Sequence, residues 1–356
     1  MPPPRVGRKL ILALASAVVA LEVGLRVVDA RGGRTADDYL PERTQARLYE
    51  PHPFIGYVLR PGSRRDRKGY AGNVNSLGMR GPERSAEKPP GIFRILCLGG
   101  STTFGTACTS DETTYPAQLE RLLNESPPPG ITYEVWNCGV SGYTTAEDLV
   151  NLSLRLLAYD PDAILLYEGG NDARPVVSSG FKPDYTHIRR AWTETEMSAV
   201  EGFLVRHWRT YAWLTRDVRV NQTLTQRLYV PNLEELRLPP GDRINEEGIA
   251  TYLRNLRNII VVAREAGIEP VLSTFATCTA KNAPGDADIV RVIERMNVEV
   301  RALCAKMSVG CIEVDDVLSE REGLFVDVMH LNDKGCRAHA LVVRDDARKQ
   351  GLFQPH

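Results

Sequence analysis

A serine follows an apolar run and two glycines in the segment RILCLGGSTTFG, residues 94–105. Two kinds of site use such a turn: a phosphate cradle of backbone N–H groups, or a serine nucleophile at the mouth of a sheet. The phosphate cradle is disfavoured, because Thr106-Ala107 stands where a P-loop needs Lys followed by Ser or Thr. The G-x-G-x-x-G turn of dinucleotide-binding sites is also missing here. The turn therefore favours Ser101 as a nucleophile.

A serine nucleophile needs a base, and the base needs a carboxylate that orients it. Two of the six histidines have an aspartate three residues earlier, which gives the pairs Asp184…His187 and Asp327…His330. The second pair follows the last predicted strand and directly precedes the last predicted helix. We therefore expect it at the same sheet edge as Ser101, and this position favours His330 over His187 as the candidate base.

Further hydrogen-bond donors follow the next two predicted strands. The segment NCGVSG, residues 137–142, brings glycines whose backbone N–H groups can approach a ligand closely. The segment EGGND, residues 168–172, places the side-chain amide of Asn171 beside the same crevice. Each segment alone is ordinary turn chemistry. Their positions at consecutive strand ends indicate donors for a developing oxyanion.

Strand-length and helix-length segments alternate from residue 91 onward and would position these groups. We predict strands over 93–98, 133–138, 162–170, 269–275 and 310–314, and helices over 113–125, 145–159, 246–266, 286–307 and 333–348. Asn245 is the predicted cap of the third helix, whose first turn is acidic. This alternation predicts a parallel sheet with helices on both faces, whose functional loops lie at the carboxyl ends of the strands.

Two regions stand outside this alternation. Residues 31–90 are rich in Arg, Pro and Gly, and we interpret them as a stalk followed by an N-terminal extension of a main domain over 91–356. An insertion at about 173–244 holds three of the four tryptophans and is predicted to be helical around 204–220. It is either a packing subdomain or a lid that contributes to substrate specificity.

The N-terminus indicates export. Three basic residues precede an uncharged apolar run over 10–21, and Glu22 and Arg26 then interrupt the apolar pattern. This arrangement is typical of a signal peptide or an N-terminal membrane anchor, here within residues 1–30, and a buried amphipathic helix is the alternative. We therefore expect an extracytoplasmic protein, either secreted or periplasmic, or anchored to the membrane by this helix.

The composition of the chain limits the kinds of partner and metal site that we expect. The chain is 43% hydrophobic and 25% charged with a net charge of −1, which suits a globular protein and argues against nucleic acid as a partner. The seven cysteines include no Cys-x-x-Cys pair, so the spacing typical of a cysteine metal site is absent. Cys304 and Cys311 are near neighbours and form a candidate disulfide in an exported protein.

The motifs G-G-S, N-x-G-x-x-G, G-G-N-D and D-x-x-H-L-N occur in this order over about residues 91–345. Together they resemble the SGNH/GDSL hydrolase superfamily. The resemblance implies a three-layer α/β/α sandwich with a central, mostly parallel five-stranded sheet of the flavodoxin-like kind, here with a helical insertion. The chain departs from the family at one position, because the first motif commonly reads Gly-Asp-Ser and Gly100 replaces the aspartate.

The resemblance also implies roles for single residues. Ser101 would be the nucleophile, with His330 as general base and Asp327 as its orienting partner. The backbone N–H groups of Ser101 and Gly142 and the Asn171 amide would form the oxyanion hole. No metal and no organic cofactor would be needed.

The implied function is a serine esterase or acyl hydrolase that cleaves carboxylic esters of small molecules, glycans or lipids. Two alternatives remain open at this point. The same nucleophile could transfer acyl groups to an envelope polysaccharide, or the chain could be an envelope binding protein without catalysis.

Overall fold

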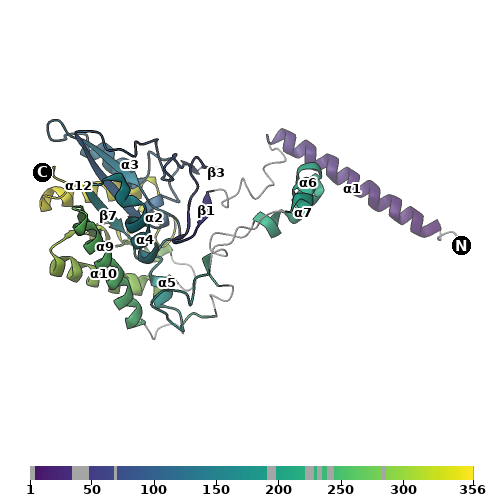
Figure 1. The fold of residues 1–356 in the computed structure, drawn as a ribbon. Coiled ribbons are helices and arrows are strands. Elements are labelled where there is room, and N and C mark those ends of the chain that lie inside the picture. The colour runs from purple at the N-terminus through teal and green to yellow at the C-terminus, as the bar shows by residue number, and fades with distance from the viewer. Residues whose placement is uncertain are drawn as a thin grey trace.

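The computed structural model of the chain describes residues 5–33, 48–67, 70–190, 198–220, 228–230, 235–238, 244–281 and 286–355. Its centre is a five-stranded sheet in the order β6-β5-β7-β8-β9, and all neighbouring pairs in it are parallel. The strands are β5 (Ile92–Gly99), β6 (Thr132–Asn137), β7 (Ala163–Tyr167), β8 (Glu269–Ser273) and β9 (Gly310–Ile312). The predicted parallel sheet is confirmed (Figure 1).

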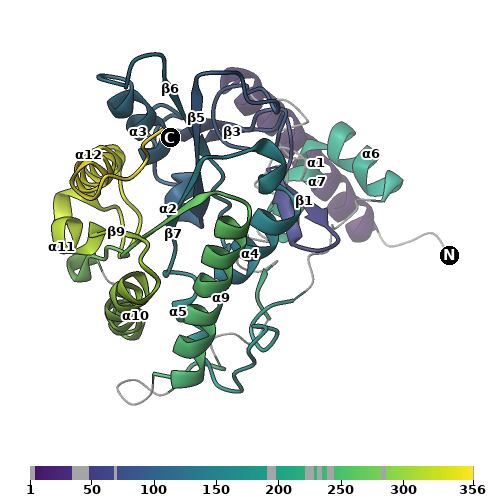
Figure 2. The same ribbon diagram turned by 60° about the vertical axis from the view of Figure 1, so that its left-hand side comes forward.

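Helices cover both faces of the sheet and complete the predicted three-layer sandwich (Figure 2). Contacts join α3 (Tyr115–Leu123) to α12 (Asp333–Gln350), α4 (Thr145–Leu154) to α9 (Glu246–Glu265), and α9 to α10 (Asp286–Met307). Every residue of β7 is buried. Because helices cover the sheet on both sides, its inner strands carry continuous apolar runs rather than an alternating pattern.

Polar caps fix where two long helices begin. The Asn245 side chain accepts the backbone N–H groups of Glu247 and Gly248 at the start of α9, as predicted. At the start of α12 the Asn332 side chain accepts the N–H of Gly335. Since Asn332 stands two residues after His330, its cap also fixes where the chain leaves the candidate site.

Several predicted elements are shorter in the structure. The strands predicted over 133–138, 162–170 and 269–275 end at Asn137, Tyr167 and Ser273. The helix predicted over 145–159 ends at Leu154, because Arg155 leaves the helical conformation (φ −127°, ψ −49°) and a 3₁₀ helix, η4 (Leu156–Tyr159), follows. The last strand ends at Ile312. The remaining short elements, none of which was predicted, are α2 (Ser101–Phe104), α5 (Ala173–Val176), η5 (Thr279–Lys281), α11 (Val314–Leu318) and η6 (Glu322–Leu324).

Two antiparallel hairpins precede the sandwich, within the segment interpreted as an extension. They pair β1 (Tyr49–His52) with β2 (Gly56–Leu59), and β3 (Arg64–Arg67) with β4 (Tyr70–Asn73). Buried residues of the first hairpin share a core with residues after β5 and β6 and with the insertion: Tyr49, Tyr57, Val58, Leu59, Phe104, Val140, Tyr143, Ile188 and Tyr229. Most of the predicted stalk, residues 34–47, lies outside the described residues.

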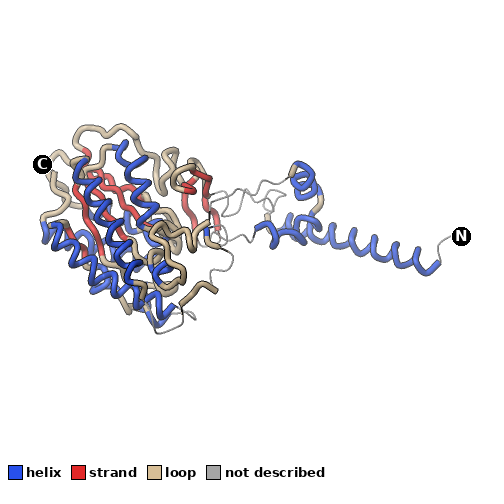
Figure 3. Tube along the Cα trace, turned by 60° about the horizontal axis from the view of Figure 1, so that its bottom comes forward, coloured by secondary structure: helices blue, strands red, loops and turns tan. Residues whose placement is uncertain are grey.

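Three helices form a separate unit beside the sandwich (Figures 1 and 3). They are α1 (Arg5–Arg31), α6 (Ala199–His207) and α7 (Arg209–Val220), and we call them the helical unit. Helices occur where the insertion was predicted to be helical, and α7 contacts both α1 and α6. Helix α7 of the insertion therefore packs against the N-terminal helix. Trp192 lies outside the described residues.

The prediction of a transmembrane anchor is not supported. Among the residues that the structure describes, no helix is long and apolar enough to cross a membrane. The two charged residues that interrupt the apolar run of α1 form an ion pair, with Arg26 Nη2 2.8 Å from Glu22 Oε1. Glu22 also accepts the backbone N–H of Thr210 at 2.7 Å. These charges therefore belong to the contact between α1 and α7.

Candidate active site

The turn after β5 presents Ser101 at the carboxyl edge of the sheet. Gly99 has φ 145°, and a Cβ atom there would lie 2.4 Å from the carbonyl oxygen of Tyr167 on the neighbouring strand. Only glycine fits this close approach, and the chain then turns directly into α2. Ser101 is the first residue of that helix, where a backbone N–H has no partner within the helix. The turn thus exposes both the hydroxyl and the N–H of Ser101.

Ser101, His330 and Asp327 lie in one hydrogen-bonded row. Ser101 Oγ is 2.7 Å from His330 Nε2, and His330 Nδ1 is 2.7 Å from Asp327 Oδ2. Asp327 also accepts the backbone N–H groups of Met329 (3.0 Å) and His330 (2.8 Å). A local turn therefore fixes the carboxylate, and the carboxylate in turn fixes the imidazole.

The surroundings of Asp327 keep it ionised. Burial opposes ionisation, but the hydrogen bonds from the His330 ring and from the N–H groups of Met329 and His330 outweigh it and lower the pKa of Asp327 to about 2. An ionised partner favours the imidazole tautomer with its proton on Nδ1. His330 Nε2 is then free to accept the Ser101 hydroxyl proton, so the row can carry out proton transfer from serine.

The three predicted oxyanion donors lie in the segments that follow β5, β6 and β7. Asn171 Nδ2 donates to the Tyr143 carbonyl at 2.8 Å and lies only 2.6 Å from where a Gly100 Cβ would be. Gly142, with φ 87°, lies in the loop that follows β6. Asn171 thus connects the loop after β7 to the loop that contains Gly142, next to the residue before Ser101.

Residues outside the predicted motifs hold the Gly142 loop. The Tyr57 hydroxyl of β2 donates to the Ser141 carbonyl at 2.8 Å, which orients the peptide unit that contains the Gly142 N–H. Arg189, from the insertion, donates to the Gly142 carbonyl at 2.5 Å and forms an ion pair with Glu147. Sequence reasoning missed both groups, because no local spacing connects either of them to Gly142.

Three buried carboxyl groups lie behind the turn: Asp148, Glu168 and Asp172. Burial raises the pKa of all three, and the neighbouring Asp172 raises that of Glu168 further, to about 8. Asp172 accepts hydrogen bonds from the backbone N–H and hydroxyl of Thr145 and from the hydroxyl of Tyr185. Glu168 and Asp172 belong to the EGGND segment, but only Asn171 was singled out there.

The alternative pair, Asp184 and His187, is not assembled as a base with its carboxylate. Asp184 accepts the N–H and hydroxyl of Thr186. His187 Nδ1 accepts the backbone N–H of Lys182, its Nε2 lies 3.3 Å from the Pro175 carbonyl, and burial lowers its pKa. Both ring nitrogens of His187 therefore contact backbone groups. The structure brings His330 rather than His187 to Ser101.

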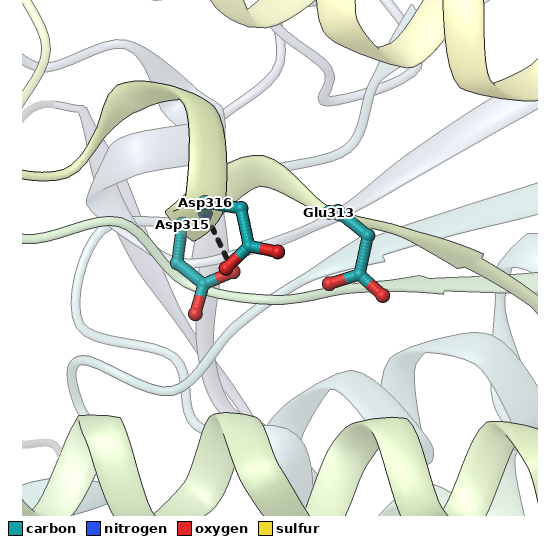
Figure 4. Close-up of side chains that lie close together, drawn as sticks. All are labelled: Glu313, Asp315 and Asp316. Atoms are coloured by element: carbon teal, nitrogen blue, oxygen red, sulfur yellow. Dashed lines mark hydrogen bonds between the residues drawn. The ribbon is translucent and has the colours of Figure 1, made fainter.

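Three acidic side chains lie close together after β9. Figure 4 shows Glu313, Asp315 and Asp316, whose carboxylate atoms lie within 4.8 Å of one another. Arg301 donates to all three, at 2.6 Å to Glu313, 2.5 Å to Asp315 and 2.9 Å to Asp316. The guanidinium group thus supplies positive charge to this cluster, which is part of the contact between α10 and the segment after β9.

The cysteines are all free thiols, including the candidate pair Cys304 and Cys311. Cys108 Sγ and Cys336 Sγ lie 3.2 Å apart, and this neighbouring pair was not predicted.

A cavity of about 450 Å³ beside β6 is lined by Asn73, Arg80 and other residues, and its lining includes neither Ser101 nor His330. This cavity is therefore separate from the candidate site, whose three residues are half-buried.

The chain matches the model of one protein family and is similar to several solved structures. The model of the GDSL-like lipase/acylhydrolase family matches residues 97–338, and no curated protein matches the chain. Similar solved structures include an acetylxylan esterase from Geobacillus stearothermophilus, at 15% identity over 73% of this chain and 94% of that one, with a TM-score of 0.43. A GDSL-like lipase from Bacteroides thetaiotaomicron is 13% identical over 72% of this chain and 88% of that one, with a TM-score of 0.40.

Proposed function

The chain belongs to the GDSL-like lipase/acylhydrolase family, and on this premise we propose that it is a serine esterase whose nucleophile is Ser101. Membership places it among the ester-cleaving hydrolases. The observation that carries the finer proposal is the row of hydrogen bonds from Ser101 Oγ through His330 to Asp327, 2.7 Å at each step. This row has the geometry that an activated serine requires.

The first half-reaction forms an acyl-enzyme. His330 Nε2 takes the Ser101 proton while Oγ attacks the ester carbonyl carbon, and Asp327 stabilises the imidazolium that forms. The tetrahedral intermediate collapses when its carbon–oxygen bond to the alcohol breaks and His330 gives the proton to the leaving oxygen. Water then attacks the acyl-enzyme with His330 again as base, which releases the carboxylic acid and restores the Ser101 hydroxyl.

The oxyanion is the group that most needs stabilising in both half-reactions. The proposed donors are the N–H groups of Ser101 and Gly142 and the Asn171 amide. They come from three consecutive strand ends, so the sheet itself sets their spacing. Losing one such donor typically slows an enzyme about 10²- to 10³-fold.

The substrate class follows from the family and from the proposed chemistry. We infer a carboxylic ester of a small molecule or of a polysaccharide, since the family is one of acylhydrolases and the proposed steps need only chain residues and water. Transfer to a polysaccharide hydroxyl uses the same acyl-enzyme and would require that water be excluded. The described helices α6 and α7 contact α1 and one another, so they do not support that alternative.

Hydrolysis of p-nitrophenyl acetate by the purified full chain tests the proposal. Ser101→Ala is expected to abolish turnover while the thermal unfolding temperature stays within a few degrees of the original. His187→Ala is the matched control for a histidine that lies outside the row, and we expect its activity to be unchanged. Full activity in Ser101→Ala would overturn the assignment.

We also propose an extracytoplasmic location, supported by the basic start and apolar run of residues 5–21. An alkaline phosphatase fusion after Gly33, which is active only outside the cytoplasm, measures it. Activity is expected in that fusion, and an inactive fusion that is expressed intact would contradict the location.

A further inference from the structure

Gly100, the residue before Ser101, leaves a space that two other side chains fill. A Cβ atom at this position would lie 2.7 Å from Glu168 Oε2, 2.6 Å from Asn171 Nδ2 and 3.2 Å from the Tyr143 carbonyl. The first two distances are too short for any real Cβ contact. The space beside residue 100 is therefore already taken by Glu168, which stands directly after β7, and by the Asn171 amide.

Glu168 binds the backbone after β7 and packs against the turn after β5. Its Oε1 atom accepts the N–H of Gly169 at 2.9 Å and the N–H of Asn171 at 3.3 Å. Its Oε2 atom has no hydrogen-bond partner among the described residues and lies in the space beside Gly100. Only 2% of Glu168 is exposed to solvent. One buried side chain thus connects the residue before the candidate nucleophile to the residue that carries the candidate amide donor.

The protonation of Glu168 fits an internal role of this kind. Burial and the neighbouring Asp172 raise its pKa to about 8, so the group is mostly a neutral acid at pH 7. A neutral acid keeps its acceptor oxygen and avoids an uncompensated charge behind the oxyanion. Glutamine is its near-isosteric replacement, since it offers the same acceptor oxygen on a neutral side chain.

We propose that Glu168 is a positioning residue for the ester-cleaving site: through Oε1 it holds the Asn171 backbone, and by filling the space beside Gly100 it packs that segment against the turn before Ser101. It does not touch the substrate and transfers no proton. The inference rests on the proposed function of Ser101. It has one distinctive consequence, which is that a side chain at residue 100 and the side chain of Glu168 exclude each other.

Four variants of the full chain test the inference: Glu168→Ala, Glu168→Gln, Gly100→Asp, and the double variant of Gly100→Asp with Glu168→Ala. Active sites are first counted by titration with a fluorophosphonate, so that kcat refers only to folded, reactive enzyme. We expect Glu168→Ala to lower kcat about 10²-fold with KM nearly unchanged, because a displaced donor acts mainly on the transition state. Glu168→Gln should stay within about threefold of the original, because it keeps the acceptor.

The double variant tests whether residue 100 and Glu168 compete for the same space. Gly100→Asp alone should lower kcat at least about 10²-fold, because its Cβ collides with Glu168 and Asn171. Removing the Glu168 side chain in that background should restore kcat at least about tenfold, since the aspartate can then enter the vacated space. A double variant no better than Gly100→Asp alone would overturn the inference, as would an unchanged kcat in Glu168→Ala.

A matched control separates positioning from general stability. Glu120 also accepts a backbone N–H, that of Val135 at 2.7 Å, but it belongs to α3 and forms an ion pair with Arg84. Glu120→Ala should lower the unfolding temperature and leave kcat per titrated site unchanged. An equal loss of kcat in Glu120→Ala would show that any carboxyl that binds a backbone N–H acts this way and would overturn the inference. If Ser101 itself is not labelled in the original chain, the proposed function fails instead, so the two failures are distinguishable.

Discussion

The candidate site and the helical unit are held together in different ways. Around Ser101, groups from three strand ends, the N-terminal hairpin and the insertion converge on a few backbone positions, and most of them are buried. Among the side chains that the structure describes in the helical unit, only Val205 and Ala212 form a buried apolar core. Many large apolar side chains in this part of the chain are exposed: Leu14, Val18, Val19, Leu21, Val23, Val27, Val28, Val200, Phe203, Trp208, Trp213 and Leu214.

In place of a large core, the helical unit has one carboxylate at its centre. Glu22 of α1 accepts the backbone N–H groups of Arg209 (3.0 Å) and Thr210 (2.7 Å) and the Thr210 hydroxyl (2.9 Å) at the start of α7. Asp29 adds an ion pair with Arg209 at 3.0 Å. We infer from this difference that sheet topology fixes the candidate site, whereas the attachment of α1 depends on a few polar contacts.

The largest expected effect concerns the base. His330→Ala should lower kcat by about 10⁴- to 10⁶-fold, because Ser101 then has no group to take its proton. Hydrogen exchange of the α7 amides should stay the same, because His330 belongs to the sandwich whereas α7 packs against α1 and α6. The esterase assay and amide exchange by mass spectrometry check the two halves. Faster hydrogen exchange of the α7 amides in His330→Ala would contradict the structural independence of the two regions.

Asp327→Asn should lower kcat by about 10⁴-fold, because an amide does not select the tautomer with the proton on Nδ1. The same group contributes to pH-dependent stability. The folded pKa of about 2 lies below the ordinary value of 3.8, so the contribution is present above pH 4 and is lost as pH falls toward 2. Urea unfolding at pH 2 to 5 measures it. Equal acid sensitivity in Asp327→Asn would contradict this account.

The N-terminal hairpin should behave as part of the site. Tyr57→Phe removes the donor to the Ser141 carbonyl, and we expect a loss of about 1–3 kcal/mol in unfolding free energy. A loss of about tenfold in kcat should accompany it, because the Gly142 peptide is no longer held. Tyr133→Phe is the control, since the Tyr133 hydroxyl, near the start of β6, donates to the Phe353 carbonyl and not to the Gly142 loop. It should cost stability alone, and an equal effect of both variants on kcat would refute the role of Tyr57.

The smallest effect on catalysis is expected at Glu22. Burial raises its pKa, but the hydrogen bonds from Thr210, Arg209 and Arg26 outweigh this and lower it to about 2. Glu22→Gln removes the negative charge from the start of α7, which is worth about 0.3–1 kcal/mol, so the Thr210 amide should exchange up to about fivefold faster. The kcat should not change. As pH falls from the ordinary value of 4.5 through 2, the original chain should lose the same protection. A drop in kcat would connect the helical unit to the site.

Much of the sandwich and the row of candidate catalytic groups could be predicted, because both depend on local sequence. The apolar run of β7, the cap at Asn245 and the Asp327…His330 spacing are short-range patterns with a direct structural meaning. Parallel strands then bring their carboxyl ends to one edge, so residues as distant as Ser101 and His330 could be expected together.

What escaped prediction depends on contacts that no spacing encodes. Tyr57 and Arg189 approach the Gly142 loop from far along the chain, and no spacing within EGGND connects Glu168 to Gly100. The apolar run near the N-terminus predicts a signal peptide or a membrane anchor. The structure shows its charged residues in contact with the insertion, since Arg26 donates to the His207 carbonyl of α6 and Glu22 accepts the Thr210 N–H of α7.

The most direct test of the central claim is to identify the residue that becomes covalently modified. The full chain is treated with a fluorophosphonate and digested, and the adduct is located by tandem mass spectrometry. We predict one adduct on Ser101 in the original chain, and none on this residue in His330→Ala under the same conditions. An adduct on a different residue, or folded chain that is not labelled, would contradict the account.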